Sequence, residues 1–148
     1  MNKIILTAVL FILFAAYGNA QVEYLNSEMD GSVTLRATGQ GKNQKDAVEQ
    51  AKKNALYEVI FNGIRGAEGS LQRPLIFEVN AREKHSNYFN QFFSDKGPYR
   101  DFISMKDQKK GSKVKIDGDV QVKYIITVRV LVPELKNQLT QDKIIKKK

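Results

Sequence analysis

The sequence predicts an α+β domain in which helices pack on one face of a mixed, largely antiparallel sheet. Three observations support this class. Residues 32–38 alternate apolar and polar side chains with period two, which is typical of a half-buried strand. From Asn43 onward the apolar spacing changes to the period of a helix. Between Val114 and Val132 the even-numbered residues are apolar except Gly118, which predicts a return to strands.

Residues 1–20 have the pattern of a secretory signal peptide. A short basic start precedes an apolar run over residues 4–17, and small residues follow at Gly18 and Ala20. This predicts cleavage before Gln21 and a mature protein in the periplasm or at the cell surface. An uncleaved anchor is the alternative, but a spanning helix needs about 20 apolar residues, and this run is shorter.

Composition limits the possible chemistry. The chain has 24 basic and 16 acidic residues; removing Lys3 with residues 1–20 leaves 23 against 16, a net charge of +7 over 128 residues. That length predicts one domain. The absence of cysteine excludes disulfides, thiolate metal sites, cysteine nucleophiles and a lipid-modified N-terminal cysteine.

The mature chain is expected to begin with an N-terminal arm at residues 21–31, followed by the α+β domain at 32–142 and a basic tail at 143–148. In the first predicted strand, Val33, Leu35 and Ala37 face the core. Gly39-Gln40-Gly41 is expected to break this strand, because glycine is common where the chain turns.

A long helix is predicted to start at Asn43, a good N-cap, with Asp46 near the positive end of the helix dipole. Glu49 and Lys53 are spaced as an i,i+4 ion pair. Gly63 or Gly66 is expected to end the helix. Its buried face is predicted to comprise Ala47, Val48, Ala51, Ala55 and Val59.

The middle of the chain is predicted as a loop over residues 67–74 and a second helix capped by Asn80. The run 75–79 is either a strand or the start of that helix. The helix is expected to end at Lys96-Gly97-Pro98. One face is aromatic and is either core or an exposed patch for a partner. That face comprises Ala81, His85, Tyr88, Phe89 and Phe92.

The last part is predicted as an extended segment at 99–105, a hydrophilic connection at 106–112 and two strands joined at Asp117-Gly118-Asp119. A three-residue loop there would pair Ile116 with Val120 and keep both on the core face. Pro133 closes the last strand, and residues 134–145 form a short terminal helix.

No catalytic, cofactor or metal site is predicted. His85 is the only histidine and is interpreted as a half-buried packing residue. Asp117 and Asp119 are interpreted as turn residues, because a calcium loop needs more oxygen ligands. Gly39-Gln40-Gly41 lacks the remaining residues of a phosphate-binding loop. The chain is therefore expected not to be an enzyme.

A basic turn is the one candidate binding site. Its lysines fit an anionic ligand such as a lipid head group or a cell-wall polymer, although a solvated surface is the simpler interpretation. Nucleic acid is not expected, because the protein is exported and its aromatic residues belong to the core. The candidate residues are Lys106, Lys109, Lys110, Lys113 and Lys115.

Thr38-Gly39-Gln40-Gly41-Lys42, followed by Asp46-Ala47 and the helical stretch 50–56, resembles a bacterial envelope family. That family groups a small outer-membrane surface lipoprotein with the N-terminal domain of the flagellar H-ring assembly protein. The later match is a valine-rich strand at 120–132 before a short helix. This chain differs from the lipoprotein members because it lacks the lipidation cysteine.

The resemblance implies an envelope-associated interaction or assembly domain without catalytic residues. The expected partner is an envelope protein or an anionic envelope polymer, with peripheral membrane association as a further possibility. The alternative function is a binding module for an anionic envelope ligand, which would be held by the basic turn.

Overall fold

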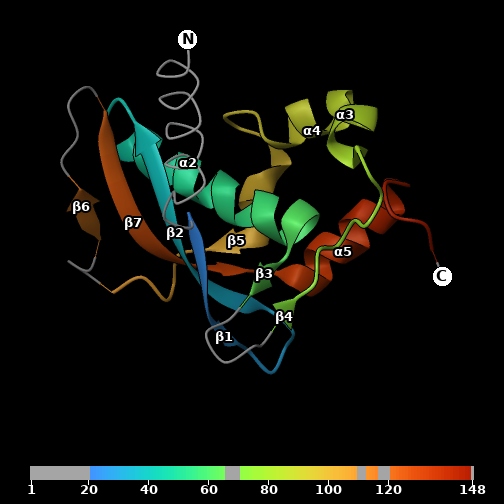
Figure 1. The fold of residues 1–148 in the computed structure, drawn as a ribbon, viewed down its shortest axis with the longest axis horizontal. Helices are drawn as coiled ribbons and strands as arrows, with labels where there is room; N and C mark the ends of the chain where they lie inside the picture. Colours follow the sequence, from blue (N-terminus) through green and yellow to red (C-terminus); the bar gives the residue numbers. More distant parts are fainter. Residues whose placement is uncertain (1–20, 66–70, 110–112, 117–120, 148) are drawn as a thin grey trace, which may run out of the picture.

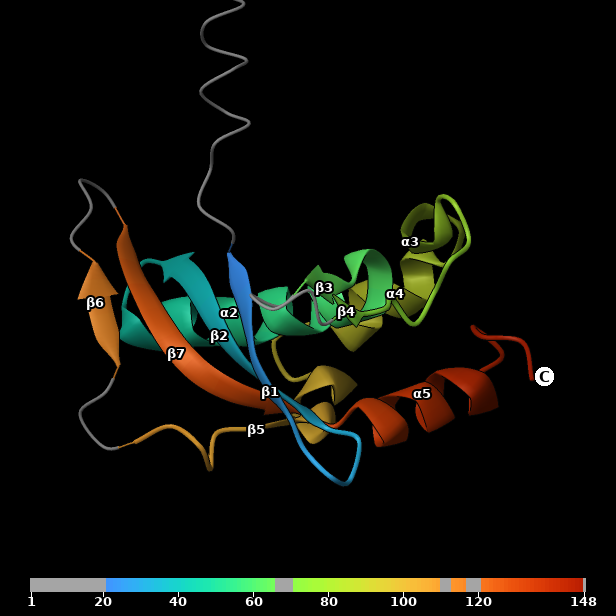
Figure 2. The same cartoon turned by 60° about the horizontal axis from the view of Figure 1, so that its bottom comes forward.

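The main sheet is antiparallel and has the order β1-β2-β7-β5, with β6 also paired to β7, and two further strands form a separate hairpin (Figure 1). The computed structural model describes residues 21–65, 71–109, 113–116 and 121–147. β2 (Val33–Gly41) and β7 (Val122–Val130) pair along their whole lengths. Helix α2 (Gln44–Tyr57) packs against both central strands. Figure 2 shows these strands side by side, with α2 across one face. The predicted α+β class is confirmed.

The segment predicted as an N-terminal arm contains a strand. β1 (Val22–Ser27) pairs antiparallel with β2, Val22 opposite Ala37 and Tyr24 opposite Leu35. Directly opposed residues share a face of the sheet, so these side chains lie on the side covered by α2. Residues 22–27 therefore belong to the sheet and are not a separate arm.

The glycines after Thr38 do not break the strand as predicted. β2 continues through Gly39 and Gly41, because glycine is needed there for the close approach of α2. A Cβ added to Gly39 would lie 2.0 Å from the carbonyl oxygen of Ala47 and 2.3 Å from the amide nitrogen of Ala51. Glycine at this position serves helix–strand contact instead of a turn.

Helix α2 begins as predicted. The Asn43 side chain accepts a hydrogen bond of 3.0 Å from the backbone N–H of Asp46, which satisfies an unpaired donor of the first turn. The helix continues into the π-helical turn η1 (Glu58–Asn62) and ends at Gly63, where φ is +75°. The predicted inward face is confirmed, and it is completed by Leu56.

The ion pair predicted between Glu49 and Lys53 is wrong. Glu49 pairs with Lys52 at 2.7 Å, and Lys53 pairs with Asp95 at 3.3 Å. The cause is tertiary, since Tyr99 and Arg100 also approach the Glu49 carboxylate from outside the helix.

After Gly63 the chain forms a short hairpin from β3 (Ile64–Arg65) and β4 (Leu71–Gln72). The following run, residues 75–79, is neither strand nor helix. The amides of Leu75 and Ile76 donate to the carbonyls of Val59 and Ile60 at 3.1 and 2.9 Å. These carbonyls lie at the end of a helix, where such groups need partners from outside it.

The predicted second helix is interrupted. α3 (Ala81–Lys84) and α4 (Ser86–Phe92) meet at His85, whose φ of −109° and ψ of 36° depart from the helix. Asn80 adopts a φ of 60° and makes no capping hydrogen bond through its side chain, so the predicted cap is wrong. The aromatic face packs inward, with Phe89 and Phe92 buried.

The segment predicted as extended from 99 to 105 starts instead with the 3-10 helix η2 (Pro98–Phe102), followed by β5 (Ile103–Ser104). Proline suits the first helical position, because it has no N–H to leave unpaired there. η2 buries Tyr99 and Phe102, and β5 pairs with the end of β7.

The register of β6 (Val114–Ile116) differs from the prediction. Ile116 lies opposite Lys123 instead of Val120, and Val114 lies opposite Ile125. Val114 and Ile116 therefore share the outer face with Ile125 and are 50% and 41% exposed. The predicted turn at Asp117-Gly118-Asp119 lies outside the described residues.

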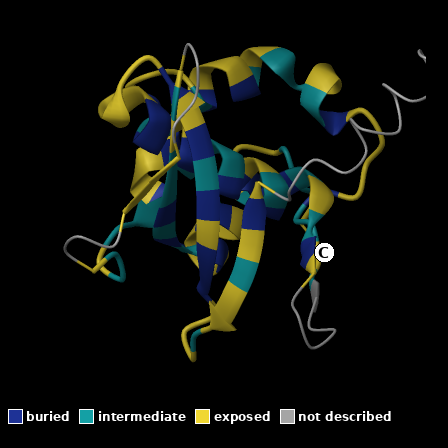
Figure 3. Cartoon of the chain, turned by 60° about the vertical axis from the view of Figure 1, so that its left-hand side comes forward, coloured by how far each residue is buried: buried dark blue, intermediate teal, exposed yellow. Residues whose placement is uncertain are grey.

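On β7 the predicted alternation is confirmed. Ile126, Val128 and Val130 are buried, and Figure 3 shows the change between buried and exposed residues along the strands. The terminal helix α5 (Val132–Gln141) buries Leu135 and Leu139. Among the described residues, no helix has the length and apolar character needed to cross a membrane. The predicted signal peptide, residues 1–20, lies outside the described part.

Candidate functional site

The structure separates the lysines of the predicted basic turn. Lys106 and Lys109 lie on the connection between β5 and β6, Lys115 lies within β6, and Lys113 immediately precedes it. Lys115 is opposite Tyr124 and so shares the helix-facing side of the sheet. Lys110 lies outside the described residues. The described lysines therefore lie in different parts of the structure and not in one turn.

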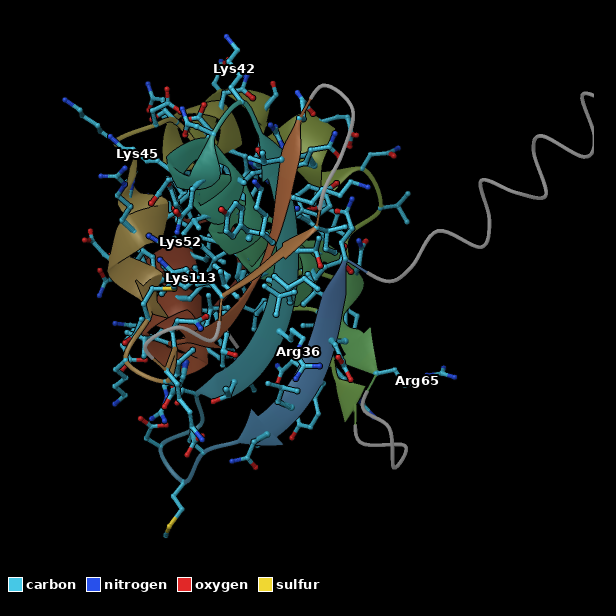
Figure 4. All side chains as sticks on the ribbon, turned by 90° about the vertical axis from the view of Figure 1, so that its left-hand side faces the viewer. Arg36, Lys42, Lys45, Lys52, Arg65 and Lys113 are labelled. Carbon is cyan, nitrogen blue, oxygen red and sulfur yellow. The ribbon has the colours of Figure 1, made fainter. Side chains whose placement is uncertain are left out.

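Lys113 lies beside the start of α2 instead of forming part of one turn cluster. Together with Lys45 it lines a hollow of about 470 Å³, which we call the basic hollow. Figure 4 shows Lys42, Lys45, Lys52 and Lys113 on the same side of the molecule. Neither Lys45 nor Lys113 forms an ion pair within the described part of the chain. The remaining lining residues are Asn43, Gln44, Val48 and Glu49.

The connection that carries Lys106 and Lys109 is fixed to the outer face of the sheet by Arg129. Its guanidinium donates to both carboxylate oxygens of Asp107, at 2.7 and 2.8 Å, and lies 3.4 Å from Glu28. The hydrogen bond to Asp107 raises the pKa of Arg129, so the pair is charged at any physiological pH. Carboxylates therefore surround this part of the predicted turn.

A second polar cluster lies in a cleft between α2 and η2. The hydroxyl of the fully buried Tyr99 donates to the Glu49 carboxylate, which also binds Lys52 at 2.7 Å and lies 3.5 Å from Arg100. The Lys53 ammonium lies 5.3 Å from the centre of the Tyr99 ring. The cleft has a volume of about 440 Å³.

The protonation of this cluster indicates a structural role. Burial raises the pKa of Tyr99, and the hydrogen bond to Glu49 raises it further. Burial also raises the pKa of Glu49, but hydrogen bonds from Lys52 and Tyr99 and the charges of Lys52 and Arg100 outweigh burial, so the pKa is lowered overall. The tyrosine is protonated, and the carboxylate already has its hydrogen-bond partners. We therefore interpret the cluster as a contact that holds η2 on α2 and not as a site of proton transfer.

We expect Tyr99→Phe to lower the free energy of unfolding by about 1–2 kcal/mol, because Glu49 loses one of its hydrogen bonds.

Since the folded state lowers the pKa of Glu49, its contribution is present above its unfolded pKa of about 4.3 and is lost as pH falls through the folded value. The stability gap between the native protein and Glu49→Gln should therefore narrow below about pH 4. Urea unfolding at pH 7 and pH 3.5 measures both effects.

Tyr57→Phe is the matched control, because Tyr57 lies on α2, the helix that carries Glu49, with its side chain partly in solvent. Its cost should stay within about 0.5 kcal/mol. If Tyr99→Phe costs no more than Tyr57→Phe, the hydrogen bond to Glu49 does not stabilise η2.

The remaining sequence candidates are placed as follows. His85 is partly buried at the break between α3 and α4, and it lies near the carboxylate of Glu78. Gly39-Gln40-Gly41 lies within β2 and against α2. The described residues contain no group of three or more histidines or carboxylates that is arranged to hold a metal ion.

An apolar surface that the sequence reading did not identify lies between η1 and α3. Phe77 and Val79 are 73% and 82% exposed, and they line a hollow of about 340 Å³ with Tyr57 and Phe61. We call Phe77 and Val79 the apolar tip. The sequence pattern of residues 75–79 predicts a strand or a helix start and does not indicate which of its apolar side chains remain in solvent.

Comparisons with protein-family models, with curated proteins and with solved structures find no match for this chain.

Proposed function

We propose that the chain is an exported, envelope-associated binding domain without catalytic activity, and that it attaches to the envelope through the apolar tip. The observation that carries this proposal is the exposure of Phe77 and Val79, two large apolar side chains two residues apart. Isolated apolar residues are common on protein surfaces, whereas a group of them favours an interaction site.

Two further features support the proposal. The N-terminal pattern of residues 1–20 is that of a secreted protein. Two polar groups with altered pKa values, Glu49 and Tyr99, are hydrogen-bonded to one another. The resemblance to the envelope lipoprotein and H-ring assembly family agrees with a binding or assembly role.

The experiment is fractionation of the producing cell expressing the full chain. The wild-type protein, with Gln21 as its first residue by N-terminal sequencing, should be recovered with the envelope. The double variant Phe77→Ser and Val79→Ser should move mostly to the soluble periplasmic or extracellular fraction. Its melting temperature should be nearly unchanged, since both side chains are exposed.

Met29→Ser is the control, because Met29 is a fully exposed apolar side chain on the β1–β2 turn, away from the tip. It should fractionate as the wild type does. A double variant that remains with the envelope would contradict attachment through the apolar tip.

A second candidate function is supported by the basic hollow. Lys45 and Lys113 line the same hollow, and neither has an acidic partner among the described residues. An anionic envelope polymer would require cations that are unpaired in this way. In the same fractionation, release of Lys45→Glu with Lys113→Glu, and retention of the tip variant, would favour this candidate over the first.

A further inference from the structure

We propose that the partner of the apolar tip is an anionic lipid surface, so that the domain docks peripherally on a membrane. This inference rests on the proposed function and names the chemistry that the tip recognises. Three features of the described residues carry it: a fixed base, two protruding apolar side chains and an excess of positive charge around them.

The base of the tip is held by the body of the protein. The amides of Leu75 and Ile76 are bonded to the carbonyls of Val59 and Ile60, and the Ile76 side chain is only 7% exposed. These bonds and the buried Ile76 side chain hold the chain in place directly before Phe77. Phe77 and Val79 are therefore presented outward from a fixed position, which lowers the entropy lost on binding.

Cations surround the tip. Arg82 lines the same hollow as Phe77 and Val79, and Lys84 forms an ion pair with Glu78, the residue between them. The hydrogen bond from Lys84 lowers the pKa of Glu78, and the charges of Lys84, of His85 and, as the smallest contribution, of Lys146 in the C-terminal tail lower it further.

The tail therefore supplies charge to the tip from the far end of the sequence. Figures 1 and 2 both show the C-terminal segment at the end of the molecule that carries α3. Lys147 is the next exposed cation of that segment. The basic residues Arg82, Lys84, Lys146 and Lys147 outnumber the acidic Glu78 and Glu83 by four to two, a local net charge of +2.

This combination matches a membrane surface better than it matches a polymer. Exposed apolar side chains enter the boundary between head groups and acyl chains, while neighbouring lysines remain among the anionic head groups. A hydrophilic polyanion would use the cations but would leave Phe77 and Val79 in water. Both side chains protrude, as insertion into a lipid layer requires.

The test uses purified mature protein and sedimentation with vesicles of equal parts phosphatidylglycerol and phosphatidylcholine, at about 0.1 M salt. The wild type should bind these vesicles and should bind pure phosphatidylcholine at least tenfold more weakly. Phe77→Ser with Val79→Ser should weaken binding at least tenfold, through lost insertion. Lys146→Glu with Lys147→Glu should do so as well, because each basic residue near an anionic surface contributes a factor of about five.

Two controls separate the tip from general charge and hydrophobicity. Met29→Ser removes an exposed apolar side chain elsewhere, and Lys42→Glu with Lys96→Glu reverses the same number of charges at exposed positions outside both the tip and the basic hollow. Both control variants should bind anionic vesicles within about twofold of the wild type. This range includes the small loss of affinity that any reduction of net charge causes. Unchanged melting temperatures of all variants establish that folding is not the cause.

Wild-type protein that does not bind the anionic vesicles, or tip variants that bind them as the wild type does, would overturn the inference. The cell fractionation distinguishes this failure from failure of the proposed function. If the tip variant leaves the envelope but the wild type ignores vesicles, the attachment stands and its partner is a protein or a glycan. If vesicles bind but the tip variant stays in the envelope fraction, the lipid surface is upheld and attachment in the cell uses other residues.

Discussion

Replacing Gly39 by alanine should destabilise the protein by about 4 kcal/mol or prevent folding altogether, which places it among the most damaging single substitutions. The new Cβ would lie 2.0 Å from the Ala47 carbonyl oxygen and 2.3 Å from the Ala51 amide nitrogen. Both neighbours are backbone atoms, so no side chain can rotate away. The contact is relieved only if α2 moves off β2 and β7, which opens the core.

Gln40→Ala is the control for this substitution, because Gln40 is the next residue of the same strand and its side chain is exposed. Chemical unfolding should place it within about 0.5 kcal/mol of the wild type. An alanine at position 39 that unfolds at the same denaturant concentration as Gln40→Ala would show that α2 is not seated on this strand.

Removing the ring of Phe89 should cost about 3–5 kcal/mol, the usual range for a buried phenylalanine changed to alanine. Phe89 is fully buried and joins the end of α2 to α4. Its ring centre lies 4.9 Å from that of Phe61, 5.1 Å from Tyr88 and 6.3 Å from both Phe92 and Phe93. The cavity would therefore weaken several aromatic contacts together.

Phe77→Ala is the matched control, because the same ring is removed from a side chain that is 73% exposed. Its stability should change by no more than about 0.5 kcal/mol in the same urea titration. Equal costs at positions 77 and 89 would contradict the division between an aromatic core and an exposed apolar tip.

Local patterns in the sequence were sufficient to predict features that depend on neighbours along the chain. The period-two alternation identified β2 and the core face of β7, and the helical period identified α2 with its buried alanines. The helix cap at Asn43 and the end of the last strand near Pro133 follow from backbone chemistry within a few residues. Such features predict the α+β class, because each element buries the face that its own pattern makes apolar.

Interactions between distant residues were decided only by the tertiary structure. β6 pairs with β7 so that Ile116 lies opposite Lys123, three residues from the predicted partner Val120, and a shift by an odd number of residues moves Val114 and Ile116 to the outer face. Glu49 binds Lys52 and the hydroxyl of Tyr99, while Lys53 binds Asp95, a residue far from it in the sequence. Gly39 remains in the strand because a helix lies directly above it.

The candidate surfaces have the same origin. Lys113 and Lys45 line the same hollow although they are 68 residues apart in the sequence. Lys146 and Glu78, which are equally far apart in the sequence, also lie near one another. Phe77 and Val79 are as apolar as core residues, but they lie in solvent, next to a backbone segment that is hydrogen-bonded to the end of η1 at Leu75 and Ile76. The sequence by itself determined the two central strands β2 and β7 and the main helix, through local periodicity, whereas the place of β1 in the sheet came from the tertiary structure. Which surfaces those segments expose was decided by packing, because exposure depends on what the rest of the chain covers.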